Sequence, residues 1–272
     1  MGEEIQATAE ALARVRQLSR AIQRSAGQPA SFRDITEALS RLIHANVYLV
    51  NLDGELVGKA LEIGFECEIL EQVVLRTGRF PPDYAEGLLR VADTVSNIRQ
   101  SGRKCVFDRA RDCIQEGKIT TIVPVFGRGE RLGTLLLARF DRPFTDADLI
   151  LAEYGSTIAA IEFIRQKQEE SQSEERLRNG VRLALATLSF SELDAIEHIC
   201  TELGGSEGLL VASKIADQAG ITRSVIVNAL RKLESAGIIA SRSLGMKGTY
   251  IRILNPFFLT ELRHAREESA RV

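Results

Sequence analysis

Apolar side chains recur at spacings of three and four residues along several stretches of this chain, and that period predicts amphipathic α-helices. Ser31 and Asp34 form a capping pair at the start of one of them, and Pro81 and Pro82 stand at the start of another. The predicted helices of the first half of the chain cover residues 3–25, a stretch from the cap at Ser31 to near residues 44–46, residues 65–76, and a stretch that starts at Pro81 and Pro82 and runs to Leu89.

Four short β-rich runs, at residues 47–50, 56–57, 119–125 and 132–139, predict strands. The first two are separated by Asp53 and Gly54, which favour the positive φ angles of a type I′ turn, and the last two by the glycine-containing segment 127–129. The polar segment 93–112 is predicted to be irregular. Helices combined with antiparallel hairpins describe an α+β domain, which we assign to residues 1–144.

A long helix is predicted to follow, because Thr145 and Asp148 form a capping box ahead of a continuous helical pattern. Residues 166–178 are rich in Gln, Glu, Lys and Ser and carry almost no apolar stripe, which is typical of a solvated helical spacer. We therefore assign residues 145–190 to a linker helix. Ser191 is predicted to cap the first helix of a third segment, residues 191–272.

A helix-turn-helix is predicted in this third segment from the spacing of Ala216, Gly220 and Ile226. The alanine permits close helix crossing, the glycine allows a positive φ in the turn, and the isoleucine returns to the shared core. Thr222 is predicted to supply the N-cap oxygen of the second helix. Residues 238–253 follow as two β-rich runs around a glycine-containing tip, the pattern of a wing. The alternative is a helical hairpin used for dimerisation.

The outward face of this module carries residue types that contact DNA. Arginine and asparagine read base edges, while hydroxyls and lysines hold phosphates. Residues 212–250 contain six Lys or Arg and two acids, an excess of +4, whereas the whole chain has a formal net charge of -2. The predicted DNA-binding residues are Ser213, Lys214, Thr222, Arg223, Ser224, Asn228, Arg231, Lys232, Arg242, Ser243 and Lys247.

Composition narrows the class of protein further. The chain has 272 residues, 44% of them hydrophobic, and no apolar run long enough to span a membrane. Its N-terminus lacks the pattern of a signal peptide, so we expect a cytoplasmic protein. The four cysteines form no C-x2-C pair, so we expect buried thiols and no metal site.

Two groups of motifs identify a family. In the first half they are TTIVP at residues 120–124, GERLGT at 129–134 and DLILAEYG at 148–155; in the second half they are residues 208–237 and SRSLGMKGTY at 241–250. These stretches closely resemble the CodY family of bacterial repressors. The resemblance implies an N-terminal GAF domain, a long linker helix and a C-terminal winged helix-turn-helix. It also implies a homodimer formed through the GAF domain and linker, and a global regulator that senses branched-chain amino acids, in many members together with GTP.

The effector region departs from that family pattern. Phe80, Pro81 and Tyr84 match the family's aromatic and proline pocket wall, but the family's carboxylate-binding arginine falls on Leu70 and one of its pocket methionines on Val74. The resemblance places the far side of the pocket near Lys104 and Phe107. A buried carboxylate requires a cationic partner, for which Arg76, Arg79, Arg103 and Lys104 are the candidates. The alternative is that Phe80 and Tyr84 fill the space themselves.

GTP is not expected to bind, because Asp53 and Glu55 occupy a hairpin turn that is basic in the members proposed to bind nucleotide there. Glu162 and Lys167 do match the family's proposed nucleotide contacts. The leading prediction is a dimeric DNA-binding repressor, not an enzyme, that responds to isoleucine, leucine or valine and requires no cofactor. The alternatives are a related DNA-binding protein that has lost or changed its effector and, more remotely, a GAF-fold enzyme using the thiols of Cys67, Cys105 or Cys113.

Overall fold

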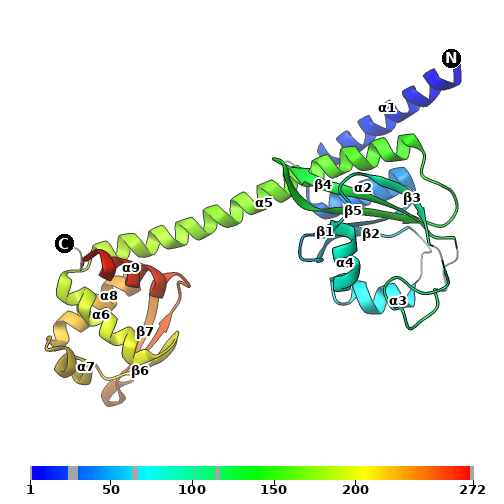
Figure 1. The fold of residues 1–272 in the computed structure, drawn as a ribbon. Coiled ribbons are helices and arrows are strands. Elements are labelled where there is room, and N and C mark those ends of the chain that lie inside the picture. Colours follow the sequence, from blue (N-terminus) through cyan, green and yellow to red (C-terminus); the bar gives the residue numbers. More distant parts are fainter. Residues whose placement is uncertain (1, 24–29, 63–66, 101, 114–116, 270–272) are drawn as a thin grey trace. The chain divides into compact units, whose positions relative to one another are not determined.

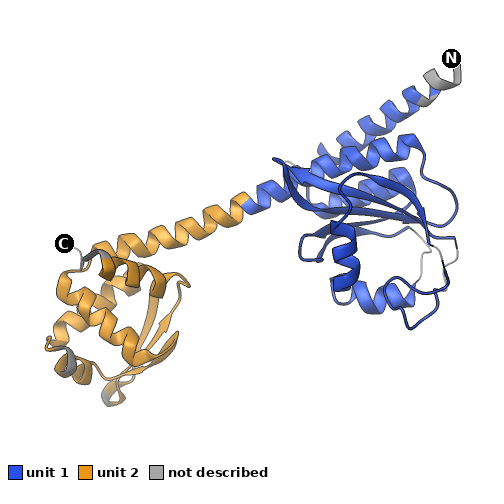
Figure 2. Cartoon of the chain, in the orientation of Figure 1, with its two compact units in different colours: residues 1–167 blue, residues 168–272 orange. Residues whose placement is uncertain are grey.

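The computed structural model describes residues 2–23, 30–62, 67–100, 102–113 and 117–269. The chain separates into two compact units, residues 1–167 and 168–272 (Figure 2). Helix α5 (Asp146–Ala186) contributes its first half to unit 1 and its second half to unit 2. Each unit has its own hydrophobic core, and the two units are described separately.

Unit 1 is built on a five-stranded antiparallel sheet with the strand order β2-β1-β5-β4-β3. The four predicted strands are present, together with an additional edge strand, β3, inside the segment predicted to be irregular. The strands are β1 (Asn46–Asn51), β2 (Leu56–Ala60), β3 (Val95–Arg99), β4 (Ile119–Gly127) and β5 (Glu130–Arg139).

Strand β3 was not predicted from the sequence, because contacts with residues distant in the chain hold it in place. Its pairing with β4 shifts register between Val95 and Ile98, and Asn97 has a positive φ of 58°. The Asn97 side chain bonds to the backbone of Phe144, accepting from its N–H and donating to its carbonyl. A bulged edge strand of this kind has no alternating apolar pattern to reveal it.

Helices cover both faces of the sheet (Figure 1). The helices of unit 1 other than α5 are α1 (Gly2–Gln23), α2 (Phe32–Ile43), α3 (Glu68–Leu70), the π-helical turn η1 (Glu71–Leu75) and α4 (Pro82–Leu89). Successive residues of β1 alternate between two clusters: Val47 and Leu49 pack with α1, α2 and α5, whereas Tyr48 and Val50 pack with α3, η1 and α4. Because side chains alternate across a strand, one sheet supports two separate apolar layers. The start of the helix predicted over 65–76 lies outside the described residues, as does the break predicted at Gly27 and Pro29.

The caps and turns of unit 1 follow the sequence with one exception. Ser31 and Asp34 form the predicted capping box, and Thr145 and Asp148 exchange the two bonds of another. The type I′ turn predicted at Asp53 and Gly54 is wrong. Only Gly54 has a positive φ, because the Asn51 side chain accepts the N–H groups of Asp53 and Glu55 and builds a longer loop. The two-residue turn with both φ angles positive lies instead at Arg128 and Gly129, between β4 and β5.

Unit 2 contains three helices and a small antiparallel sheet of order β6-β8-β7, followed by a last helix. Its elements after α5 are α6 (Phe190–Leu203), β6 (Glu207–Leu210), α7 (Ala212–Ala219), α8 (Arg223–Ser235), β7 (Ile239–Ser243), the 3₁₀ turn η2 (Gly245–Lys247), β8 (Thr249–Ile253) and α9 (Phe258–Ser269). The predicted cap at Ser191 is wrong: Ser189 is the N-cap of α6 and forms a capping box with Glu192. Glu192 stands three residues after Ser189, which is the spacing that this motif requires.

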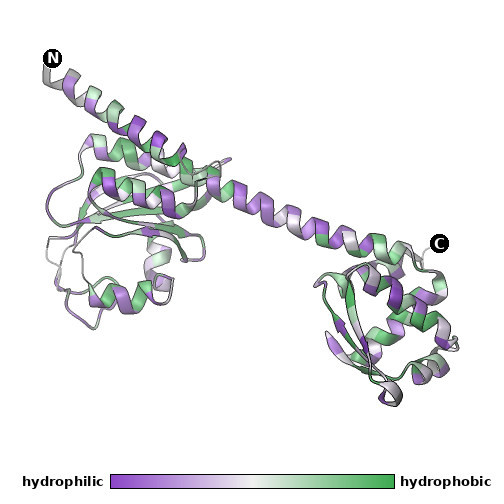
Figure 3. Cartoon of the chain, turned by 180° about the vertical axis from the view of Figure 1, so that it is seen from behind, coloured by the Kyte–Doolittle hydropathy of each residue, from purple (hydrophilic) through white to green (hydrophobic). Residues whose placement is uncertain are grey.

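The second half of α5 is anchored to unit 2 by a buried carboxylate. Glu261 on α9 accepts bonds from Arg178 and Arg182, at 3.2 and 2.8 Å, and its side chain is 2% exposed. The bond from Arg182 lowers the pKa of Glu261 despite burial. Residues 167–177 of α5 are exposed, and Figure 3 shows this stretch as mainly hydrophilic. The predicted solvated helix is therefore confirmed for residues 167–177, whereas Arg178, at the end of the predicted range, is half-buried and bonds to Glu261.

Two further findings concern membranes and metals. None of the helices in the described ranges has the length and apolarity needed to cross a bilayer. The same residues contain no cluster of three or more His, Cys, Asp or Glu side chains suited to a metal ion.

Candidate DNA interface and effector cleft

The helix-turn-helix of unit 2 has the packing that its sequence spacing predicts. Ala216 and Ile226 are buried, at 8% and 1% exposure, and Gly220 ends α7 with a φ of 65°. Thr222 occupies the N-cap position of α8, but the bond predicted from its hydroxyl to the helix backbone is absent. The Thr222 hydroxyl instead lies 2.8 Å from that of Ser224. Both hydroxyls therefore stand together at the exposed start of α8.

Helix α8 presents a polar face to solvent because its apolar stripe is fully used in the core. Ile226, Ala229, Leu230 and Leu233 pack into the unit 2 core. Arg223, Ser224, Asn228 and Arg231 are exposed, and the Arg231 guanidinium donates to the Asn228 amide oxygen at 3.3 Å. This face can enter a major groove with arginine and asparagine toward the base edges.

Val227 lies on the same exposed face and was not predicted as a site residue. Its side chain is 50% exposed, and it is placed one turn after Ser224 and one turn before Arg231. An apolar side chain in that position can contact a thymine methyl group. The sequence did contain a signal for this position, because Val227 lies at helical spacing from the predicted DNA-binding residues Ser224 and Arg231.

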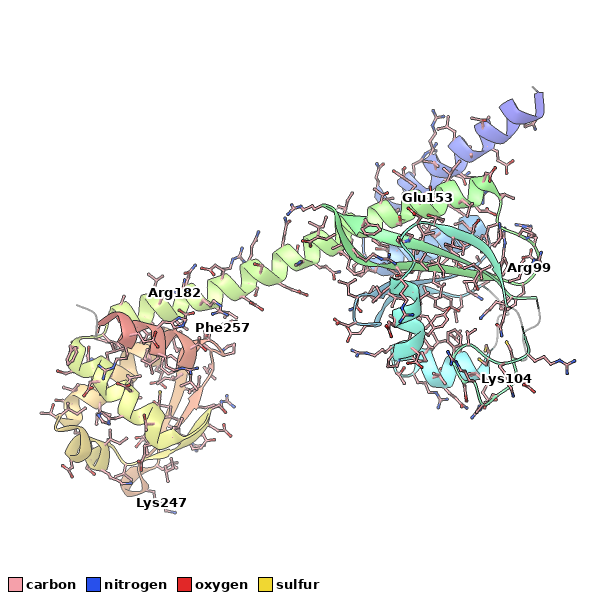
Figure 4. The ribbon with its side chains drawn as sticks, in the orientation of Figure 1. Arg99, Lys104, Glu153, Arg182, Lys247 and Phe257 are labelled. Atoms are coloured by element: carbon pink, nitrogen blue, oxygen red, sulfur yellow. The ribbon has the colours of Figure 1, made fainter. Side chains whose placement is uncertain are left out.

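The predicted wing is formed by β7, η2 and β8. Arg242, Ser243 and Lys247 are exposed along it, with Lys247 at the tip of unit 2 (Figure 4). The tip turns through Gly245 and Gly248, which have φ angles of 63° and 113°. A Cβ atom on Gly248 would collide with the carbonyl oxygen of Leu210 on β6, so the wing is seated closely on the neighbouring strand.

Two predicted DNA-binding lysines are held by acids of α6. Lys232 donates to the Thr187 carbonyl at 3.0 Å and to Glu192 at 2.7 Å, while Lys214 lies 2.5 Å from Glu202. Ser213 is exposed beside Lys214. Within the described ranges, Arg223, Arg231, Arg242 and Lys247 form no ion pair. Among the predicted DNA-binding cations, these four are therefore free to contact DNA without breaking an ion pair.

Unit 1 contains a cleft on the sheet face opposite to α1, α2 and α5. It has a volume of about 820 Å³ and is open to solvent, and an inner cavity of about 40 Å³ lies beside it. Five residues line both the cleft and the inner cavity: Tyr84, Cys105, Phe107, Lys118 and Thr120. The rings of Tyr84 and Phe107 lie 5.0 Å apart, edge to face.

The seven residues predicted for the effector pocket divide into three groups. Pro81, Tyr84, Lys104 and Phe107 line the open cleft, and Leu70 lines the inner cavity. Phe80 and Val74 line neither space. Phe80 is 1% exposed and packs with Tyr48, Tyr84 and Phe107, so that ring fills space in the core behind the cleft.

Sequence reasoning missed the cation that lies nearest to both spaces, Lys118. Its ammonium lies 5.3 Å from the centre of the Phe107 ring, and no carboxylate in the described ranges lies within ion-pair distance of it. Burial lowers the pKa of Lys118, while the nearby thiols of Cys113, Cys105 and Cys67 act in the opposite direction. Lys118 stands directly before the β4 run in sequence, and nothing local marks it as buried.

The cations that were predicted instead are exposed. Arg79 pairs with Glu55 at 2.6 Å, Lys104 with Asp112 at 2.9 Å and Arg76 with Glu71 at 3.9 Å. The first and last of these pairs lie outside the lining of the cleft and the inner cavity. Arg103 is also exposed and lines neither space.

Two of the residues considered for nucleotide binding, Glu55 and Glu162, are engaged within the chain. Glu55 accepts bonds from Arg79 and Asn51, and the bond from Arg79 lowers its pKa. Asp53 is exposed in the loop. Glu162 is buried and accepts from Arg165 at 2.8 and 2.6 Å.

An antiparallel sheet with an open cleft, joined in one chain to a winged helix-turn-helix with an exposed polar recognition helix, is the architecture of a transcription regulator with a separate sensor domain. Comparison with known proteins identifies the family. Residues 10–187 match the model of the CodY GAF-like domain and residues 206–266 that of the CodY helix-turn-helix domain, so the chain belongs to the CodY family.

Individual relatives agree with this assignment. The chain is 56% identical over 252 residues to the global transcriptional regulator CodY of Clostridium botulinum strain Okra, covering 93% of this chain and 97% of the relative. The corresponding protein of Clostridium tetani is 54% identical and that of Clostridium beijerinckii 52%, with the same coverage. Among solved structures, the cofactor-binding GAF domain of the nutrient sensor CodY from Clostridium difficile is 31% identical, with a TM-score of 0.40, covering 56% of this chain and 97% of that one.

Proposed function

We propose that this protein is a cytoplasmic, homodimeric repressor that binds operator DNA through unit 2 and a branched-chain amino acid through the cleft of unit 1. The observation that carries the DNA-binding half is the exposed face of α8, where Arg223, Asn228 and Arg231 stand free of acids in the described part of the chain. The sensing half is supported by the cleft with its aromatic wall and by the match of unit 1 to the CodY GAF-like domain.

The amino acid acts by changing the population of the DNA-competent state. A ligand can shift such an equilibrium only by its differential affinity for the two states. Isoleucine, leucine and valine offer an aliphatic side chain for the wall formed by Pro81, Tyr84 and Phe107. Dimerisation through the GAF domain and linker helix is expected from the family.

Two measurements test this proposal. Duplexes selected from a random pool by the full-length protein should bind at least about a thousand times more tightly than scrambled ones in anisotropy titrations, as specific regulators do. Addition of isoleucine should then lower the dissociation constant for the selected duplex. Absence of any preferred duplex would refute the DNA-binding half.

The second candidate is a DNA-binding protein of this family that has lost or changed its effector. The replacement of the family's arginine by the buried Leu70 favours it. A thermal-shift screen with the twenty amino acids separates the two candidates, because a ligand that binds only the folded state raises the melting temperature. A screen without any shift, combined with intact DNA binding, would support the second candidate.

GTP is left out of the proposal. The first hairpin offers the exposed carboxylate of Asp53 to a triphosphate, and Arg79, which lies next to this hairpin, is already paired with Glu55. We expect millimolar GTP neither to raise the melting temperature nor to tighten DNA binding. A dissociation constant below about 1 mM in calorimetry would contradict this expectation.

A further inference from the structure

Among the described residues, the cleft of unit 1 is lined by a cation without a carboxylate partner and by a residue whose buried hydrogen-bond acceptor has no donor. Lys118 has no carboxylate within ion-pair distance in the described ranges, as noted above. The side-chain oxygen Oε1 of Gln100 is the one buried side-chain polar atom of the described residues without a hydrogen-bond partner. Buried polar groups are almost always bonded, so an orphaned acceptor in a cleft points to a missing donor.

The identity of that orphaned atom follows from its neighbour. The other end of the Gln100 amide, Nε2, lies 2.5 Å from the carbonyl oxygen of Lys104. A carbonyl oxygen accepts hydrogen bonds, so the atom of the Gln100 amide that bonds to the Lys104 carbonyl is the nitrogen. The atom of this amide that has no partner is therefore the oxygen, Oε1.

Gln100 and Lys118 lie opposite each other just beyond the paired ends of β3 and β4. The ladder between β3 and β4 pairs Ile98 with Thr120 and Arg99 with Ile119, and it continues with a backbone bond from Gln100 N–H to the Lys118 carbonyl at 3.5 Å. Residues opposite each other on antiparallel strands point to the same face, with Cβ atoms about 5 Å apart. Both side chains accordingly belong to the lining of the open cleft, together with Ile98 and Thr120.

The other charged groups of the cleft are already engaged or lie at its rim. Asp108 pairs with Arg111 at 3.2 Å and accepts the N–H of Ala110. Lys104 pairs with Asp112, and Asp83, Arg99 and Arg109 are exposed. Of the lining residues that the structure describes, Lys118 carries a charge without a carboxylate partner and Gln100 carries a buried acceptor without a donor.

We propose that Lys118 and Gln100 together recognise the zwitterionic end of a free α-amino acid, with the Lys118 ammonium on its carboxylate and Gln100 Oε1 on its α-ammonium. This inference rests on the proposed function and specifies the chemistry of its effector site. The two side chains lie opposite each other at the same cleft, so that one small ligand can contact both, and the rings of Tyr84 and Phe107 flank the same space for the ligand side chain. The anchor lies directly before β4, so no cation is needed at Leu70.

Ligand analogues provide the first test, on the natural full-length protein. Calorimetry compares isoleucine with isoleucinamide, which lacks the carboxylate, and with its 2-oxo acid, which lacks the ammonium. Each charge-assisted bond that is lost should weaken binding by about 10- to 100-fold. Isoleucinamide binding as tightly as isoleucine would overturn the assignment of Lys118, and tight binding of the 2-oxo acid would overturn that of Gln100.

Variants provide the second test. In Lys118→Met, isoleucine should bind about 10- to 100-fold more weakly and no better than isoleucinamide, whereas Lys118→Arg should retain most of the affinity. In Gln100→Leu, the preference for isoleucine over the 2-oxo acid should disappear. Lys59→Met, which removes the same charge from an exposed position on β2 outside the cleft lining, is the matched control and should bind isoleucine normally.

The outcomes distinguish this inference from the proposed function. Unchanged isoleucine binding in Lys118→Met would overturn the anchor while leaving an amino-acid sensor intact, and loss of binding in Lys104→Met alone would move the anchor to Lys104. No binding of any amino acid to the natural protein would overturn the inference together with the effector half of the proposal. DNA binding, measured separately by anisotropy, would still test the other half. If Lys118→Met fails to fold, the analogue series decides the question alone.

Discussion

At the scale of single residues, the unpaired cations on α8 and on the wing are placed to contact different parts of a DNA duplex. Arg223 stands at the exposed N-terminal end of the recognition helix, whereas Lys247 lies at the wing tip. The first position suits contact with base edges and the second contact with a phosphate backbone.

We therefore expect Arg223→Ala to cost about 1 to 3 kcal/mol of binding to a preferred duplex and to reduce the preference over a scrambled one. Lys247→Ala should weaken binding to both duplexes alike and reduce its salt dependence. Gel-shift titrations of both variants on both duplexes check this. An equal loss on both duplexes for Arg223→Ala would show that Arg223 contacts only phosphate.

A second residue-scale feature is the buried carboxylate of Asp148 at the start of α5. It accepts bonds from Arg14 and Arg139, both at 2.8 Å, and from the N–H of Thr145. Arg139 is itself 1% exposed. Burial favours the neutral form of Asp148, but the bonds from Thr145, Arg14 and Arg139 outweigh it and lower the pKa of Asp148.

Because this pKa is lower in the folded state, the Asp148 ion contributes stability above the unfolded-state pKa of about 3.9. That contribution is lost as the pH falls through the lower, folded-state pKa. Asp148→Asn should remove about 3 kcal/mol from the stability of unit 1 at neutral pH, since it leaves Arg139 buried without its ion. The variant should also lose less further stability on acidification.

Thermal melts of both proteins from neutral to acidic pH provide the measurement. Asp141→Asn is the control, because Asp141 and Arg142 form an exposed pair at 3.8 Å that is worth less than about 1 kcal/mol. Parallel loss of stability on acidification in the natural protein and in Asp148→Asn would contradict the role given to Asp148.

At the scale of elements, the wing of unit 2 depends on how closely it approaches β6. Gly248 has a φ of 113°, a region that side-chain-bearing residues rarely adopt, and the space for its Cβ is occupied by the Leu210 carbonyl oxygen. Gly245 has a φ of 63° and open space around it.

Gly248→Ala should consequently destabilise unit 2 by about 3 kcal/mol and weaken DNA binding, since both strain and collision displace the wing. Gly245→Ala should cost only about 1 kcal/mol, the penalty of a left-handed conformation in open space. Melting temperatures and anisotropy titrations of the two variants are the measurements. Similar effects of both substitutions would mean that the wing is not held against β6.

At the scale of the whole molecule, the chain carries separate hydrophobic cores. The two clusters of unit 1 draw their buried residues from positions 18–160, and the cluster of unit 2 draws its buried residues from positions 181–262. The exposed, polar stretch of α5 between them contributes to neither. The two units can therefore unfold independently.

Calorimetric heating should accordingly resolve two transitions. Isoleucine should raise only the transition of unit 1, by an amount that corresponds to about 2.7 kcal/mol at a hundredfold excess over the dissociation constant. A specific duplex should raise the transition of unit 2. The Gly248→Ala variant shows which transition belongs to unit 2, because it should lower the temperature of that transition alone. A single transition that both ligands shift together would show that the units unfold as one.

The sequence by itself determined the features that depend on neighbouring residues. The capping box of Ser31 and Asp34, the solvated stretch of α5 and the spacing of Ala216, Gly220 and Ile226 all act within a few residues, so a local pattern specifies them. The choice between a DNA-binding and a purely structural module followed from the same local pattern.

The tertiary structure decided what depends on residues distant in sequence. It formed the bulged strand β3, and it placed Gln100 beside Lys118 across the sheet. It buried Phe80 in the core, although the family resemblance had placed it in the pocket wall, and it paired Lys232 with Glu192, although the helical pattern had placed it on the DNA-facing side. Burial and pairing arise from strand register and helix packing, and these long-range contacts determine which charges are left for a ligand.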